Sequence, residues 1–114
     1  TFWLCEKPDS VGMVGWDAAL TRIATWVKLQ DKKTGQILMV VNTHFDHIGT
    51  EARRNSALLI IEKIKEIVGT SPAILTGDFN VSEDWDAYKP IPNNEFFLTD
   101  THKVDGKRTG VDLP

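Results

Sequence analysis

Two short polar clusters contain the residue types best suited to chemistry. The first is Gly77-Asp78-Phe79-Asn80, which follows an apolar segment. A carboxylate is a hard oxygen ligand of the kind that Mg²⁺ or Mn²⁺ prefers, so Asp78 is a candidate metal ligand. In extended backbone the side chains at i and i+2 point the same way, which lets Asp78 and Asn80 share a site while Phe79 turns into the core. Asp, Asn and Gly are also common in turns after strands, so a plain turn is an equally good interpretation of this segment.

The second cluster is the run Asn42-Thr43-His44-Phe45-Asp46-His47. The same alternation predicts that His44 and Asp46 face one side with Asn42, whereas His47 faces the other. A histidine beside an acid can act as a general acid or base, or contact a phosphate group. The alternative is a hydrogen-bonded structural histidine. We favour the functional interpretation for His44, because polar residues crowd directly behind a buried strand, and the structural one for His47.

A strand–helix–strand unit would position both clusters. Residues 36–43 are nearly continuously apolar, which predicts a strand buried on both faces, and residues 73–76 predict another short buried strand. Residues 50–68 predict a helix with an apolar stripe, Thr50 as the N-cap and Gly69 at the C-terminal stop. A crossover helix of this length favours parallel strands, whose carboxyl ends meet at one edge of the sheet. Ligands of α/β folds bind at that edge, and both clusters are expected there.

The remaining segments predict further strands and loops. Residues 2–5 and 20–30 have strand patterns, the second with strict alternation. Residues 31–35 predict a hairpin loop in which Gly35 supplies a positive φ. Residues 84–89 predict a helical turn and residues 96–100 a strand.

Composition limits the class of protein. The 114 residues carry 13 Lys and Arg against 16 Asp and Glu, a net charge of −3 that argues against a large non-specific nucleic-acid surface. The single cysteine excludes an intrachain disulfide, and Cys5 is predicted to be a small buried hydrophobe. No apolar run approaches the roughly 18–20 residues that a membrane span needs. Both ends look cut, and the sequence assigns no cellular compartment.

The two clusters, with Ala52-Arg53-Arg54 between them, are similar in order and spacing to the endonuclease/exonuclease/phosphatase superfamily of metal-dependent phosphoester hydrolases. Gly15-Trp16-Asp17, the segment 22–26 and the segment 98–101 resemble its bacterial, uncharacterised branch. The fold that this resemblance implies is a two-sheet α/β/β/α sandwich of about twice this length. We therefore expect an α/β fold, about half of that sandwich, with a mixed sheet and a β-α-β unit. Residues 1–114 would be an internal fragment of one domain.

The resemblance implies roles for three residues of the reaction centre. His44 would contact the scissile phosphate and support charge development. Asp78 would orient the attacking water and bind the metal, and Asn80 would stabilise the phosphoryl oxygens. The implied reaction is in-line attack of water on a phosphoester, assisted by Mg²⁺ or Mn²⁺ acting as a Lewis acid.

Three further residues would support this centre. The resemblance implies that Arg22 neutralises phosphate charge and that Asp46 positions either His44 or Arg54. The substrate would be a nucleic acid or a small phosphoester, and the acidic net charge slightly favours the small one. No obligate protein partner is inferred.

The sequence also departs from the superfamily pattern. The asparagine and metal-binding glutamate that the superfamily places nearer the N-terminus, and its C-terminal Ser-Asp-His segment, have no counterpart here. His102 is predicted to lie in a surface loop. The chain would thus hold half an active site, be inactive alone and expose a large apolar sheet face.

Two other hypotheses fit some of the same residues. The run 44–49 resembles the tail of the metallo-β-lactamase signature H-x-H-x-D-H-x-G, which builds a zinc site, but Asn42 stands at the first histidine position. A non-catalytic phosphate-binding domain is the third hypothesis. The zinc hypothesis requires that His44, Asp46 and His47 converge, whereas phosphoester hydrolysis requires that His44 lie beside Asp78 and Asn80.

Overall fold

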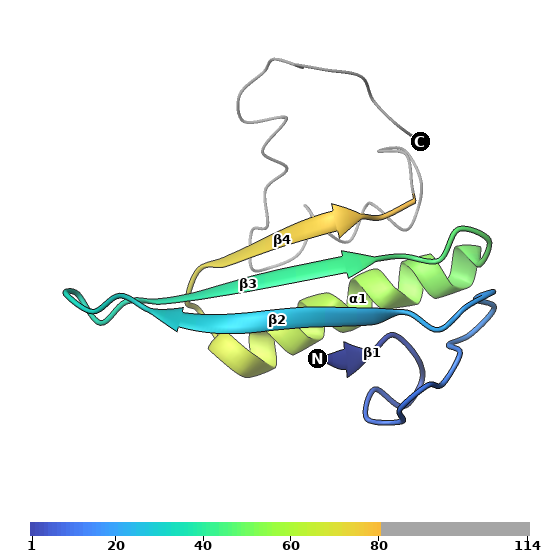
Figure 1. Ribbon diagram of the computed structural model, residues 1–114, viewed down its shortest axis with the longest axis horizontal. Helices are drawn as coiled ribbons and strands as arrows, with labels where there is room; N and C mark the ends of the chain where they lie inside the picture. The colour runs from blue at the N-terminus through green and yellow to red at the C-terminus, as the bar shows by residue number, and fades with distance from the viewer. Residues whose placement is uncertain (81–114) are drawn as a thin grey trace, which may run out of the picture.

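The computed structural model describes residues 1–80, in which four strands form one mixed sheet and a helix covers one face (Figure 1). The strands lie in sequence order: β1 (Phe2–Trp3), β2 (Ile23–Gln30), β3 (Ile37–His44) and β4 (Ala73–Asp78). The pairs β1–β2 and β2–β3 are antiparallel, and β3–β4 is parallel, joined through helix α1 (Thr50–Val68). The predicted mixed sheet and β-α-β unit are confirmed, and β4 is two residues longer than predicted. The segments predicted at 84–89 and 96–100, and His102, lie outside the described residues.

The β2–β3 hairpin forms as its turn residues predict. The Asp31 carboxylate accepts hydrogen bonds from the backbone N–H groups of Thr34 (2.9 Å) and Lys33 (2.7 Å), and these bonds hold its pKa below the usual value. Gly35 has the positive φ, +77°, that the loop requires.

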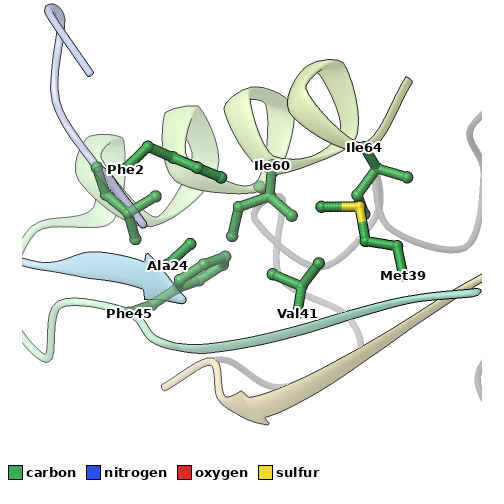
Figure 2. Close-up of a cluster of buried hydrophobic side chains, with 9 residues drawn as sticks. Phe2, Ala24, Met39, Val41, Phe45, Ile60 and Ile64 are labelled. Atoms are coloured by element: carbon green, nitrogen blue, oxygen red, sulfur yellow. The ribbon is translucent and has the colours of Figure 1, made fainter. Parts of the chain in front are cut away.

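The core lies between the sheet and α1. Ala24, Met39 and Val41 point from the strands toward Ile60 and Ile64 of the helix, and all five are buried (Figure 2). Strand alternation in β2 and β3 and the helical stripe of α1 therefore meet as the sequence predicts. Cys5 is also buried, as expected.

The opposite face of the sheet is open. Ile23, Val27, Leu29 and Ile74 are each at least 40% exposed. The prediction that β3 is buried on both faces is wrong for this part of the chain, because α1 packs on one side only and Val40 on the other side is half-buried. An exposed apolar sheet face is therefore present, as the fragment hypothesis expects.

Helix α1 spans the predicted residues, but its N-terminal cap differs from the prediction. Thr50 is the first helical residue, Gly49 precedes it, and no cap side chain bonds the helix. Instead the Asp17 carboxylate accepts from the backbone N–H groups of Ala52 (2.6 Å) and Glu51 (3.2 Å). Gly69, with φ +59°, ends the helix as predicted. No helix within residues 1–80 is long and apolar enough to cross a membrane.

Replacing Asp17 should therefore weaken α1. Two helix N–H groups lose their acceptor in Asp17→Ala, so we expect the free energy of unfolding to fall by about 0.5–2 kcal/mol, as for other N-cap losses. Urea unfolding of the protein that carries this chain measures the change. Asp9→Ala, at an exposed loop position, is the matched control. Equal stability of the two variants would exclude the capping role.

Candidate functional site

His44 and Asp78 form the centre of the polar edge. They end β3 and β4, and they are register partners in the parallel pair. The distance from His44 Nε2 to Asp78 Oδ2 is 3.7 Å, and the side chains are 57% and 54% exposed. This separation is too long for a direct hydrogen bond but short enough for both groups to contact one small ligand. The structure thus brings together the two clusters that lie more than 30 residues apart in the sequence.

Gly77 allows β4 to approach β3 this closely. Its φ is +143°, and a Cβ atom at this position would collide with the carbonyl oxygen of Thr43. The ladder continues past it, because the Phe45 N–H donates to the Asp78 carbonyl oxygen at 2.9 Å. The glycine of the Gly-Asp-Phe-Asn run is therefore required for the alignment of Asp78 with His44.

Asn80 joins the pair through a turn. Its backbone N–H donates to Asp78 Oδ1 at 2.9 Å, and its Nδ2 donates to the Phe45 carbonyl oxygen at 2.8 Å. The expected extended geometry is wrong, since β4 ends at Asp78 and Asn80 has a left-handed φ of +51°. Phe79 does turn inward and packs edge-on against Phe45, with ring centroids 5.2 Å apart. The turn that the sequence offered as one interpretation is therefore present, and a functional role for Asp78 and Asn80 stays a prediction.

Asp46 lies away from His44, and the prediction that they face the same side is wrong. Strand β3 ends at His44, so alternation does not extend to Asp46, which is 2% exposed. Burial alone would raise the pKa of this carboxyl, but backbone N–H groups of Gly49, Ala19, Ile48 and Leu20 donate to it. These bonds outweigh burial and hold the pKa well below its usual range.

Arg22 contacts both Asp46 and His47, and we call these three residues, with the backbone N–H donors to Asp46, the Asp46 cluster. The Nε atom of Arg22 lies 3.4 Å from Asp46 Oδ1, and its Nη2 atom lies 3.1 Å from His47 Nδ1. An arginine can only donate, so His47 Nδ1 is the acceptor in this contact. Arg22 directly precedes β2 and is half-buried. A role for Arg22 as a phosphate contact stays a prediction.

The arginine that Asp46 engages on α1 is Arg53. Its Nη1 donates to the Asp46 backbone oxygen at 3.0 Å, and Arg53 is 4% exposed, whereas the predicted supporting residue Arg54 is exposed. Sequence reasoning missed Arg53. The available signal was its spacing, since position 53 falls on the buried stripe with Ala57 and Ile60. The supporting role of Arg54 stays a prediction.

The convergence that the zinc hypothesis requires is absent from residues 1–80. His44 lies beside Asp78, whereas Asp46 and His47 contact Arg22. The described residues contain no group of three His, Cys, Asp or Glu side chains that could hold a metal ion. Asp78 places an exposed carboxylate next to His44, and its hard oxygens suit Mg²⁺ or Mn²⁺.

Comparisons with known proteins identify the class that this fold and site define. No protein-family model matches the sequence. The structure is similar to an endonuclease/exonuclease/phosphatase from Bacteroides vulgatus, at 69% identity and a TM-score of 0.79, over 82% of this chain and 36% of that one. It is similar to a mannosyl-6-phosphatase from Bacteroides thetaiotaomicron, at 48% identity and a TM-score of 0.70, over 77% of this chain and 33% of that one. An uncharacterized protein of Acanthamoeba polyphaga mimivirus is 35% identical over an alignment of 98 positions that covers 82% of this chain and 35% of that protein.

The chain belongs to the endonuclease/exonuclease/phosphatase superfamily. It spans about a third of the length of these relatives. A four-stranded mixed sheet with one helix layer is accordingly part of the sandwich fold, as the resemblance predicted.

The Asp46 cluster predicts a specific loss of stability in acid. The pKa of Asp46 is lower in the folded state than in the unfolded state. Its contribution to the free energy of unfolding is therefore fully present at pH values above the ordinary pKa of about 3.9, and it is lost as the pH falls toward the folded-state pKa. Asp46→Asn should lower the free energy of unfolding near neutral pH by about 3–5 kcal/mol, since Arg22 loses its charged partner and an NH₂ donor replaces one of the two acceptor oxygens that the buried N–H groups use.

Urea unfolding from neutral pH to acid tests this expectation. The difference between Asp46→Asn and the unmodified protein should shrink below about pH 4. Asp9→Asn is the matched control and should show no such pH-dependent loss. A difference that stays constant over the whole pH range would refute the assignment.

Proposed function

We propose that this chain forms part of a metal-dependent phosphoester hydrolase that acts by in-line attack of water. The observation that carries the proposal is the His44–Asp78 pair, with its 3.7 Å separation at the exposed edge of the parallel strands. Membership of the superfamily supports phosphoester hydrolysis as the general activity, and one similar structure is a mannosyl-6-phosphatase.

Asp78 is suited to orient the attacking water. The Asn80 N–H already occupies Asp78 Oδ1, which fixes the carboxylate and leaves Oδ2 on the side of His44. A water that donates to Oδ2 would be held next to the histidine. In the reaction the water oxygen forms a bond to phosphorus, the ester P–O bond breaks, and the departing alcohol oxygen takes up a proton.

His44 and Asn80 are suited to contact the phosphoryl group. His44 Nε2 is exposed beside Asp78 and can donate to a phosphoryl oxygen when it carries a proton. One N–H of the Asn80 carboxamide donates to the Phe45 carbonyl oxygen, and the second, which has no partner within residues 1–80, can donate to the substrate. Fixed donors of this kind stabilise charge that develops in the transition state without reorganisation.

A divalent cation would bind at Asp78. The metal supplies Lewis-acid activation of the phosphoryl group when it is bound. Mg²⁺ commonly takes only one or two protein carboxylates and completes its shell with waters and substrate phosphate oxygens, so the single exposed carboxylate of Asp78 is compatible with it. The substrate is a phosphoester of a nucleic acid or a small molecule.

Substitution at the pair tests the reaction. In the protein that carries this chain at full length, His44→Ala and Asp78→Asn should each lower kcat for a phosphoester by about 10²–10³, because a group that stabilises the transition state is lost. Asp9→Asn, at an exposed loop position more than 30 residues before His44 in the sequence, should leave kcat unchanged. Residues 1–114 alone should be inactive. Full activity of Asp78→Asn would rule out its assigned role.

Metal removal tests the cofactor. Chelation should abolish turnover, and Mg²⁺ or Mn²⁺ should restore it. Binding of Mn²⁺ can be followed by electron paramagnetic resonance without substrate. It should weaken by about 10-fold or more in Asp78→Ala, because this substitution removes a carboxylate ligand of the metal. Restoration by Zn²⁺ alone, with unchanged Mn²⁺ binding in Asp78→Ala, would favour the zinc-hydrolase hypothesis instead.

A further inference from the structure

One buried residue, Phe45, contacts three consecutive residues at the end of β4. Its backbone N–H donates to the Asp78 carbonyl oxygen at 2.9 Å, and its carbonyl oxygen accepts from Asn80 Nδ2 at 2.8 Å. Between these two polar contacts, the ring of Phe79 packs edge-on against the ring of Phe45, with centroids 5.2 Å apart and planes at 62°. Phe45 directly follows His44, so both halves of the candidate reaction centre are attached to the same support.

Phe45 is a rigid support. Its side chain is 0% exposed and lies in the core with Ala24 and Val41, under helix α1 (Figure 2). Protein interiors are close-packed, so a ring enclosed there has little freedom to move. A group that packs against Phe45 is therefore tied to the same core that fixes β3 and, with it, His44.

The turn after β4 depends on such a support. Strand β4 ends at Asp78, so the sheet does not hold the next two residues. Asn80 has a φ of +51°, which few non-glycine residues adopt and which surrounding contacts must maintain. The bond from the Asn80 N–H to Asp78 Oδ1 joins residues two apart and cannot by itself place the turn relative to His44. The contacts to Phe45 supply this placement.

The Phe79 ring is the part of this attachment that belongs to a side chain with no polar group. It is half-buried and packs against the core cluster. A pair of rings in edge-to-face contact favours one relative orientation, so the contact fixes a direction as well as a distance. Because Asp78 and Asn80 flank Phe79 in the chain, an anchored ring limits the rotation of both neighbours.

We infer that Phe79 is a positioning residue of the proposed hydrolase: its ring, held against Phe45, keeps Asp78 and Asn80 aligned with His44. This inference rests on the proposed function and deepens it. Phe79 has no group that could orient water or bind phosphate, so it acts through the two polar residues beside it. Loss of the ring should therefore slow the reaction step rather than weaken substrate binding.

Steady-state kinetics of the full-length protein with Mg²⁺ test the inference. The substrate is whichever is cleaved fastest among p-nitrophenyl phosphate, bis-p-nitrophenyl phosphate and an oligonucleotide. Phe79→Ala should lower kcat by about 10- to 100-fold and change KM by less than about 2-fold, because a displacement of about 1 Å at a reacting group reduces the rate on that scale. Phe79→Leu keeps an apolar side chain in the core and should lower kcat by about 3- to 10-fold with the same unchanged KM.

Ile64→Ala is the matched control for a loss of core packing. Ile64 is 3% exposed in the same core, but it lies toward the C-terminal end of α1, beside Met39 and away from the polar edge (Figure 2). This variant should unfold at a lower urea concentration than the unmodified protein and keep its kcat. Urea unfolding also establishes that each variant is folded under the assay conditions.

A double-variant cycle separates positioning from a purely structural role. If Phe79 acts through its neighbour Asp78, Phe79→Ala should lower kcat by a smaller factor in the Asp78→Asn background than in the unmodified protein. A structural role that is independent of Asp78 would give the same factor in both backgrounds. Phe79→Leu serves in the cycle if Phe79→Ala does not fold.

The outcomes distinguish the inference from the proposed function. Unchanged kcat in either folded Phe79 variant, an equal loss of kcat in Ile64→Ala, or equal factors in the two backgrounds would overturn the inference and leave the hydrolase standing. If the unmodified full-length protein cleaves none of the three substrates with Mg²⁺ or Mn²⁺, the proposed function fails, and this inference fails with it.

Discussion

The buried carboxylate of Asp46 is the interaction on which the arrangement of the described chain depends. It collects N–H groups from residues 19 and 20, which precede β2, and from residues 48 and 49, which precede α1, and it pairs with Arg22. A charge at 2% exposure is tolerated only because these donors surround it. One side chain thereby joins the start of a strand to the start of the helix, and Asp17 adds a second link by capping α1.

Asp46 and His44 are two residues apart in the sequence but have different environments. Asp46 is withdrawn from solvent and saturated with donors, whereas His44 and Asp78 are more than half exposed. Exposure leaves the pair available to a ligand, and the fixed loops behind it keep β3 in place. This difference in environment fits a structural role for Asp46 and the role in catalysis that is proposed for His44 and Asp78.

The two halves of the open face also differ. Its apolar positions, such as Val27 and Ile74, have no layer over them in the described chain, and the chain covers only about a third of its relatives' length. An apolar sheet face of this kind is normally covered by a second layer. Thr25, Asn42 and Thr76, which the register aligns across three strands, lie with the His44–Asp78 pair toward the other end of the same face.

The sequence by itself determined the elements and the edge at which the polar residues gather. Hydrophobic periodicity defined β2, β3 and α1, and a crossover helix made β3 and β4 parallel, so His44 and Asp78 had to end on one side. Only the tertiary structure decided that Asp46 turns inward and that Asp17 caps the helix, whereas helical spacing already places Arg53 rather than Arg54 on the buried stripe of α1. Alternation predicts a side chain's direction only within a regular strand or helix. Beyond the last strand residue, direction is set by contacts between segments far apart in the chain, which no local pattern encodes.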